Sequence, residues 1–209
     1  MHGFWRQRIP FAIILVFLGL AGLYISHSRG HNSPPIPSHG GEPFHNFTTL
    51  DAPFYLQDDE RWKNETLGGT GEKVGDAGCT LCSIAMALAH FGYSYTPAEL
   101  NQILKTNGGY TWRGFIKWNA ISTATNGKII IDVLSKPSLT NIDTALKNNQ
   151  PVLVKVLVAN GESHWVLILG KKGADFLIHD PLGDGHNLEP LSKYDSDIFG
   201  VRIIRQASQ

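Results

Sequence analysis

The sequence predicts an α+β domain in which helices come first and an antiparallel sheet follows. Between residues 79 and 125, apolar residues recur at helical spacing and helix-end signals are present. After residue 127 the chain changes to short runs of branched apolar residues, which are typical of strands. Because most of the helices precede the strands instead of alternating with them, we expect antiparallel pairing, with the helices packed on the sheet.

Four helices are predicted, and two of them have clear ends. The first covers residues 79–91 and stops before a glycine. In the second, within TPAELNQILKTNGG, Thr96 is the expected N-cap and Glu99 completes a capping box. A third helix is predicted over about residues 112–125, and a short fourth one lies in LTNIDTALKNN, between two strands.

Two of the predicted strands, SHWVLILG and ADFLIHD, are joined by the short segment KKG, which suits a hairpin. If the turn centres on Lys172, His164 faces Asp180 at the open end of that hairpin. Directly opposed residues share a face of the sheet, with Cβ atoms about 4.5–5.5 Å apart. The pattern therefore predicts that this imidazole and this carboxylate lie side by side. The other predicted strands are KIIIDVL, PVLVKVLV and FGVRIIR.

The N-terminal residues are distinct from this domain. Residues 9–26, IPFAIILVFLGLAGLYIS, carry no charge and follow Arg6 and Arg8. As a helix they would span about 27 Å, close to the hydrocarbon thickness of a bilayer. We therefore expect residues 1–26 to be a membrane anchor or a signal peptide, and the length of the apolar run favours the anchor. In both cases the two arginines stay in the cytoplasm and the rest of the chain is exported.

Residues 27–50 are rich in Pro, Gly, Ser and His and poor in large apolar groups, which predicts a flexible linker. The linker histidines are irregularly spaced and have no acidic or cysteine partners, so solvated histidines are favoured over a metal site. Residues 51–209 are then expected to form one domain. Lys plus Arg equal Asp plus Glu, at 18 each, so the net charge does not favour binding to nucleic acid.

Both cysteines of the chain lie in one stretch, DAGCTLCSIAMALAHFG. Cys79 follows Gly78 at the expected start of a helix, where free N–H groups and the positive end of the helix dipole favour a thiolate. A catalytic thiol needs an adjacent histidine to take its proton and a third group to orient that imidazole. Cys79, His164 and Asp180 supply these three types of group, and the hairpin already joins the last two.

Cys82 is interpreted as a small buried residue one turn into the helix. A redox pair of the thioredoxin type would need a strand directly before the C-x-x-C motif, and the preceding residues LGGTGEKVGDAG are typical of a loop. A structural zinc site would need about four ligands, and the sequence has no further cysteine. Oxidation that joins Cys79 to Cys82 is kept as a separate hypothesis.

Other histidines and the tryptophans are less favoured as functional residues. His179 is expected to point to the face opposite Asp180, and His186 lies in a glycine-rich loop. The tryptophans at positions 112, 118 and 165 are expected to be core residues more often than a substrate wall. Trp165 directly follows the predicted base and could screen it from water.

Several separate blocks of the chain together resemble one family. They occur in the order seen in cysteine peptidases of the C thirty-nine-like type, which are papain-like relatives of the bacteriocin leader peptidases, over about residues 54–205. The resemblance implies that Cys79 is the nucleophile, His164 the general base and then acid, and Asp180 the orienting residue. It also implies that Gln57 contributes to an oxyanion hole. The blocks are YLQDDERW, GCTLCSIAMAL, TPAELNQILKTNGGY, PVLVKV, SHWVLI and HDPLG.

The resemblance therefore implies a papain-like fold and a cysteine peptidase that hydrolyses a peptide or amide bond through an acyl-enzyme, and the N-terminal segment predicts that this domain is extracytoplasmic. A peptide or protein substrate is the expected partner, and no metal or organic cofactor is implied. Many members have Gly-Pro where this chain has Thr80-Leu81, which removes no catalytic group. Two alternatives stay open: a catalytically inactive binding module, and an acyl-transferring enzyme on the same fold, since an acyl-enzyme can pass to water or to an amine.

Overall fold

The computed structural model describes residues 33–208, and for residues 45–48 it describes the backbone alone. Five helices lie between the first and the third strand of this part, and a further short 3₁₀ helix, η1, lies near its end. The α-helices are α2 (Val74–Ala77), α3 (Cys79–His90), α4 (Pro97–Thr106), α5 (Ala120–Ala124) and α6 (Leu139–Lys147), and η1 covers Leu191–Tyr194.

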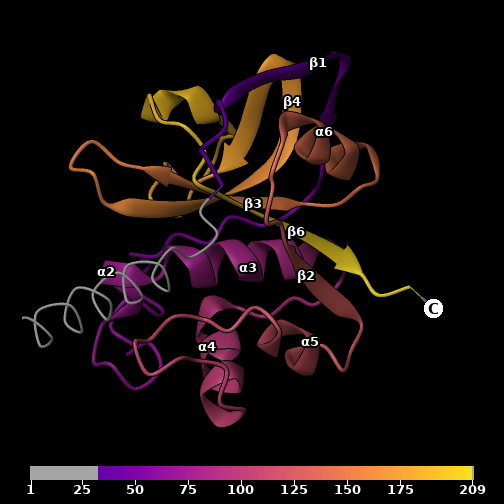
Figure 1. Cartoon of the computed structure of the whole chain (residues 1–209). Helices are drawn as coiled ribbons and strands as arrows, with labels where there is room; N and C mark the ends of the chain where they lie inside the picture. The colour runs from indigo at the N-terminus through magenta and orange to yellow at the C-terminus, as the bar shows by residue number, and fades with distance from the viewer. Residues whose placement is uncertain (1–32, 209) are drawn as a thin grey trace, which may run out of the picture. The chain divides into compact units, whose positions relative to one another are not determined.

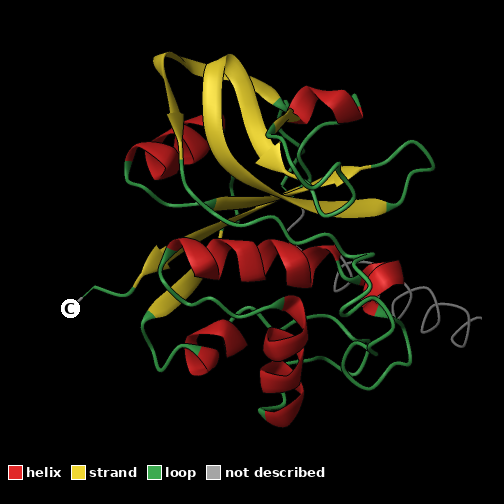
Figure 2. Cartoon of the chain, turned by 180° about the vertical axis from the view of Figure 1, so that it is seen from behind, coloured by secondary structure: helices red, strands yellow, loops and turns green. Residues whose placement is uncertain are grey.

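The strands form one antiparallel sheet with the order β1-β4-β3-β6-β2, and β5 pairs with β4. Figure 1 shows α3 running beneath the sheet, with α4 and α5 on the side of α3 away from β4, and the reverse view in Figure 2 agrees. The predicted α+β class is therefore confirmed. The strands are β1 (His39–Thr49), β2 (Ile129–Val133), β3 (Val152–Leu157), β4 (Ser163–His179), β5 (Glu189–Pro190) and β6 (Gly200–Gln206).

The helices with clear end signals form where they were predicted. In α4 the Thr96 hydroxyl accepts a hydrogen bond from the Glu99 N–H, and the Glu99 carboxylate accepts one from the Thr96 N–H, which completes the capping box. The interior of α3 is buried from Leu81 to Leu88. It is therefore the central helix of the core, between the sheet and α4.

The helix predicted over residues 112–125 is mostly absent. Only α5 is helical there, and the residues before it form a turn in which Thr111 N–H donates to the Phe115 carbonyl at 2.8 Å. The Thr111 hydroxyl also accepts from the Phe115 N–H, and Gly114 adopts φ +80°, so the backbone is diverted from helical geometry. Trp112, which was expected in the core, is 90 % exposed at this turn.

The two strands of the predicted hairpin are one continuous element, β4, which bends back on itself. His164 and Asp180 are 16 residues apart, yet their side chains are within 2.7 Å. A straight strand of that length would separate them by about 50 Å. The bend falls at the exposed residues 172–175, where Gly173 has φ +60°. The contact predicted at the open end of the hairpin is thus confirmed, and Figure 1 shows the bent ribbon.

The predicted linker is wrong for its second half, because residues 39–49 form β1 along the bend of β4. The Lys171 side chain is completely buried, and its contacts explain why residues 39–49 adopt a defined strand. Its ammonium donates to the carbonyl oxygens of Gly40 and Glu42, at 2.7 and 2.9 Å, and pairs with Asp143 at 2.5 Å. A buried ammonium requires such partners, and two of them come from the β1 backbone.

Replacing Asp143 with alanine is expected to destabilise the fold by about 3–5 kcal/mol, because the Lys171 ammonium stays buried without its counter-ion. Chemical denaturation monitored by circular dichroism measures the change. The matched control is Glu60→Ala, which breaks an exposed ion pair with Lys63 and should leave the stability unchanged within error. Equal effects of the two substitutions would contradict the role given to Lys171 in fixing β1.

Within residues 33–208 no helix is both long and apolar enough to cross a membrane. The anchor or signal peptide predicted at residues 1–26, like the first part of the predicted linker, lies outside the residues described.

Candidate active site

Cys79 is the first residue of α3, and α2 ends immediately before it at Gly78. The Gly78 N–H donates to the Val74 carbonyl at 2.7 Å, and a Cβ at this position would come within 2.3 Å of that oxygen. The glycine therefore makes room for the tight junction of the two helices. This junction places the Cys79 thiol at the amino end of α3, where it is partly buried.

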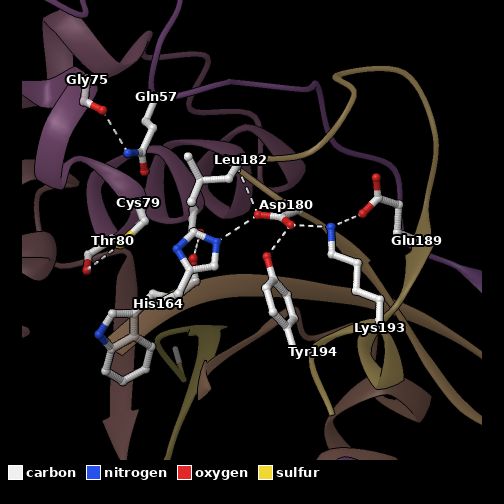
Figure 3. A network of polar contacts seen from close by, with 12 residues as sticks. Gln57, Gly75, Cys79, Thr80, His164, Asp180, Leu182, Glu189, Lys193 and Tyr194 are labelled. Atoms are coloured by element: carbon white, nitrogen blue, oxygen red, sulfur yellow. Dashed lines mark hydrogen bonds and ion pairs between the residues drawn. The ribbon is translucent and has the colours of Figure 1, made fainter. Parts of the chain in front are cut away.

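His164, near the start of β4, lies between Cys79 and Asp180 (Figure 3). Its Nε2 is 2.7 Å from Asp180 Oδ1, and both side chains are almost completely buried. Since Nε2 is taken by the carboxylate, Nδ1 is the ring nitrogen that remains for the thiol. The structure thus brings together the three residues that the sequence pattern singled out.

Asp180 has further partners that the sequence did not predict. Its Oδ1 also accepts the Leu182 N–H at 2.9 Å, while Oδ2 accepts the Tyr194 hydroxyl and lies 2.5 Å from the Lys193 ammonium. Lys193 also pairs with Glu189. Lys193 and Tyr194 belong to η1, a short element without strong local signals, so only the folded chain reveals that they hold this carboxylate.

The charges of the three groups support one another. Burial alone would raise the pKa of the Cys79 thiol, but its hydrogen bond and charge interaction with His164 outweigh burial and lower that pKa. Burial would likewise lower the pKa of His164, but hydrogen bonds to Asp180 and Cys79 raise it to about 9. Burial also opposes ionisation of Asp180, yet hydrogen bonds from His164, Lys193 and Tyr194 hold its pKa well below its usual range. The site therefore favours a thiolate beside an imidazolium.

Gln57 lies in the same cleft and is buried. Its backbone N–H donates to the Pro181 carbonyl at 3.0 Å, which ties this loop to the residue after Asp180. Its side-chain Nε2 donates to the Gly75 carbonyl at 2.9 Å, and Oε1 has no partner among the described residues. Because an amide nitrogen carries two hydrogens, one N–H of Gln57 remains for a ligand.

The other cysteine and the other candidate histidines have surroundings that differ from those of Cys79 and His164. Cys82 is completely buried, and burial raises its pKa well above the usual value, as expected for a packed hydrophobic residue. His179 stacks on the ring of Phe54, with 3.5 Å between the centroids, and burial lowers its pKa to about 4. His186 is exposed in its loop. No group of three or more His, Cys, Asp or Glu side chains within residues 33–208 is arranged to hold a metal ion.

The thiol and the imidazole open into a cleft of about 670 Å³. Trp118 and Trp165, which were expected to be core residues, line this cleft, with 5.3 Å between their ring centroids. The cleft also has charged walls: Lys155 and Arg202 on the sheet, Asp76 on α2, and Glu72 and Glu162 on loops. A volume of this size accommodates several residues of an extended peptide.

The fold and the site define a class of proteins in which a thiol at the start of a central helix faces a histidine on a bent strand. The sequence profile described as the Peptidase_C39 like family matches residues 49–196. The chain therefore belongs to this family, and the resemblance inferred from the sequence blocks is confirmed.

Two solved structures resemble the chain. One is a candidate C39-like peptidase from Bacillus anthracis, with 15 % identity, a TM-score of 0.51, and coverage of 78 % of this chain and 100 % of that one. The other is a double glycine motif protease from an AMS/PCAT transporter in complex with the leader peptide, with 17 % identity, a TM-score of 0.45, and coverage of 80 % and 99 %. At this identity the first likeness shows the fold alone. No curated protein matches the chain in sequence.

Proposed function

We propose that the chain is a papain-like cysteine peptidase that hydrolyses a peptide or related amide bond through an acyl-enzyme on Cys79. The observation that carries the proposal is the buried His164 imidazole, held at 2.7 Å by Asp180 through Nε2, with the Cys79 thiol beside it in the same cleft (Figure 3) and the pKa of that thiol lowered by His164. A thiol with a lowered pKa at a helix start, beside a paired histidine, is the arrangement required for nucleophilic catalysis.

In this proposal the Cys79 thiolate attacks the substrate carbonyl carbon, and the carbonyl oxygen takes the negative charge. The backbone N–H of Cys79 and the free N–H of Gln57 stabilise that oxyanion. The His164 imidazolium then gives its proton to the leaving amine as the C–N bond breaks, which leaves a thioester. Neutral His164 takes a proton from water as the oxygen attacks the thioester carbonyl; the C–S bond then breaks, the carboxylic acid product leaves, and the Cys79 thiolate is regenerated beside the His164 imidazolium. Asp180 keeps the imidazole oriented and stabilises its charged form.

The test is to incubate the full chain with a mixture of bacterial peptides and to identify new termini by mass spectrometry. New termini in the presence of the wild-type chain, absent after treatment with iodoacetamide, are the expected result. Mass mapping should place the adduct on Cys79. An adduct on Cys79 without any cleavage would instead favour a binding module, and added amines incorporated at the new carboxyl ends would favour acyl transfer.

The pH dependence of hydrolysis is expected to be bell-shaped. The reactive form needs Cys79 ionised, and its lowered pKa places the rising limb below the ordinary thiol value of 9.0. It also needs His164 protonated, and the raised pKa of that group keeps it protonated until the pH passes about 9. Activity should therefore rise through the lower apparent pKa of the pair and fall above about 9. The measurement is kcat/KM as a function of pH, and activity that still increases beyond pH 10 would contradict the ion pair.

Replacing Gln57 with alanine is expected to reduce kcat by about 10²–10³-fold with little change in KM, because the amide acts on charge that develops in the transition state. The Gly75 carbonyl also loses its hydrogen-bond partner. The midpoint of thermal unfolding of the variant should therefore be measured together with its kinetics. Gln57→Glu is the matched variant: it keeps the volume but removes the N–H donors, and should be at least as slow. A loss confined to KM would assign Gln57 to ground-state binding instead.

We also propose that this chemistry takes place outside the cytoplasm, with residues 9–26 anchoring the chain in the membrane. The support is the uncharged apolar run behind Arg6 and Arg8. Protease protection of intact cells or spheroplasts tests the orientation, and alkaline carbonate extraction tests the anchor. Recovery in the carbonate-soluble fraction of a chain that starts after residue 26 would favour a cleaved signal peptide.

A further inference from the structure

Arg202 on β6 lies in the wall of the cleft and has no counter-ion among the residues that the structure describes. Its guanidinium lies against both tryptophans of the cleft, with Cζ 4.8 Å from the Trp118 ring centroid and 5.2 Å from that of Trp165. Its Nη1 donates to the carbonyl oxygen of its neighbour Val201, while its Nε is buried and unpaired within the part of the chain that the structure describes. Burial lowers the pKa of Arg202, although a guanidinium remains charged at neutral pH.

Lys155 adds a second cation on the same face of the sheet, also without an ion-pair partner in the described part of the chain. The register pairs Lys155 with Trp165 on β4 and with Gly200 on β6, and directly opposed residues share a face. Gly200 has no side chain at this place: a Cβ there would lie 3.3 Å from the Trp165 ring, 3.5 Å from Lys155 Cβ and 3.8 Å from Arg202 Nη1. The indole, the guanidinium and the base of the Lys155 side chain therefore surround one point of the cleft wall.

The acidic residues of the cleft do not neutralise the positive charges of Lys155 and Arg202. Glu72, Asp76 and Glu162 are exposed, and across residues 33–208 neither Lys155 nor Arg202 forms an ion pair. By contrast, Arg61 forms an ion pair with Asp59, and Arg205 forms one with Asp132. A guanidinium desolvated between two rings, with donors left over, gains most from an incoming planar anion.

The backbone of Trp165 links this point to the helix that carries the thiol. The Trp165 carbonyl accepts the Ser83 hydroxyl of α3 at 3.2 Å, and Cys79 is the first residue of that helix. The Trp165 indole faces Arg202. Cys79, Trp165 and Arg202 line the same cleft, so a substrate bound with its reacting carbonyl at Cys79 can extend along that cleft to the Arg202 guanidinium.

From this arrangement we propose that Arg202 and Lys155, framed by Trp118 and Trp165, form a subsite for a carboxylate of the substrate. The inference rests on the proposed peptidase function and adds a substrate class to it. The carboxylate belongs to an aspartate or glutamate side chain or to a free peptide terminus. It receives hydrogen bonds from the guanidinium, and its charge compensates the two cations, while the indoles exclude water from the contact.

The experiment measures the alkylation rate of Cys79 by iodoacetyl-capped peptides of increasing length. In the first set the last residue is glutamate with an amidated terminus. In the second it is glutamine with an amidated terminus, and in the third it is glutamine with a free carboxyl terminus. For at least one peptide length, the carboxylate probe should alkylate Cys79 of the wild-type chain at least about ten times faster than its neutral counterpart does. Comparison of the first and third sets distinguishes a side-chain carboxylate from a terminal one.

Arg202→Met is expected to remove this preference, measured as the ratio of the rates with carboxylate and neutral probes, because methionine keeps length and ring contact but not charge. Arg202→Lys should retain part of the preference, and Lys155→Met should reduce it. The matched control is Lys172→Met, which removes one positive charge at the exposed bend of β4, outside the residues that line the cleft, and should leave the preference intact. If Arg202→Met does not fold by circular dichroism, Lys155→Met supplies the same comparison.

The outcomes separate the subsite from the proposed function. Equal rates for charged and neutral probes at every length, or a preference that survives in both Arg202→Met and Lys155→Met, would overturn the subsite even if peptides are cleaved. A preference that depends on Arg202, in a chain that cleaves no peptide, would support the subsite and reject hydrolysis. A wild-type chain that no probe alkylates at Cys79 would overturn both.

Discussion

Replacing Cys79 with alanine is expected to lower kcat/KM for any cleaved peptide by about 10⁴-fold or more, because no other group can form the acyl-enzyme. Labelling by iodoacetamide at this site should disappear at the same time. The residual rate would report binding and oxyanion stabilisation alone. Single-turnover assays with an identified peptide, followed by mass spectrometry, measure both effects.

The control for this prediction is built into the chain. Cys82→Ala changes the other cysteine, one turn along α3, which is completely buried and carries a raised pKa. It should keep activity within a few-fold and cost about 1 kcal/mol of stability as a small cavity forms. Activity that is lost with Cys82→Ala and kept with Cys79→Ala would refute the assignment. Inhibition by oxidants that requires both cysteines would support the disulfide hypothesis.

Replacing His164 with glutamine is expected to reduce kcat/KM by about 10⁴-fold and to move the ionisation of Cys79 upward. In the wild-type chain the thiolate is stabilised against burial by the neighbouring imidazolium. Without that partner, burial dominates, and the pKa of Cys79 should rise to or above the ordinary thiol value of 9.0. The rate of iodoacetamide labelling as a function of pH measures the shift directly, whether or not a substrate is known.

Two further variants sharpen this result. His186→Gln changes an exposed histidine and should leave both the rate and the titration unchanged. Asp180→Asn keeps the shape but removes the charge that Lys193 and His164 face, so the pKa of His164 should fall and the alkaline limb of the pH profile should move to lower pH. An alkylation profile of His164→Gln that coincides with that of the wild type would contradict the ion pair.

The parts of the fold predicted from the sequence are those with local causes. The capping box of α4 acts through residues within one turn, and the spacing KKG between two apolar runs places His164 and Asp180 together. Gln57 lies far from these residues in the chain and was identified through the family resemblance instead of its local sequence. Its hydrogen bonds to Pro181 and Gly75 explain why it nevertheless reaches the site.

The parts that were missed depend on contacts between distant segments. Residues 39–49 have a linker composition, and they become a strand because a buried lysine on β4 needs their carbonyl oxygens. The stretch around Trp112 has helix-compatible residues, but a glycine in a left-handed conformation and a threonine side chain close a turn there instead. The supports of Asp180 from η1, and the position of Arg202 between two rings, require the assembled sheet.

The hydrogen bonds and the ion pair of Lys171 determine which truncated forms of the chain can fold on their own. A fragment that begins at Asp51, where the sequence pattern becomes regular, would lose β1, two acceptors for an interior ammonium, and the strand that covers the outer edge of β4. The same bent strand presents the imidazole and leads into the carboxylate that supports it. Proteolytic cleavage between residues 34 and 50 would therefore disturb the Cys79–His164–Asp180 site indirectly, through loosening of that strand, whereas cleavage upstream of residue 34 would leave the compact unit of residues 34–209 whole.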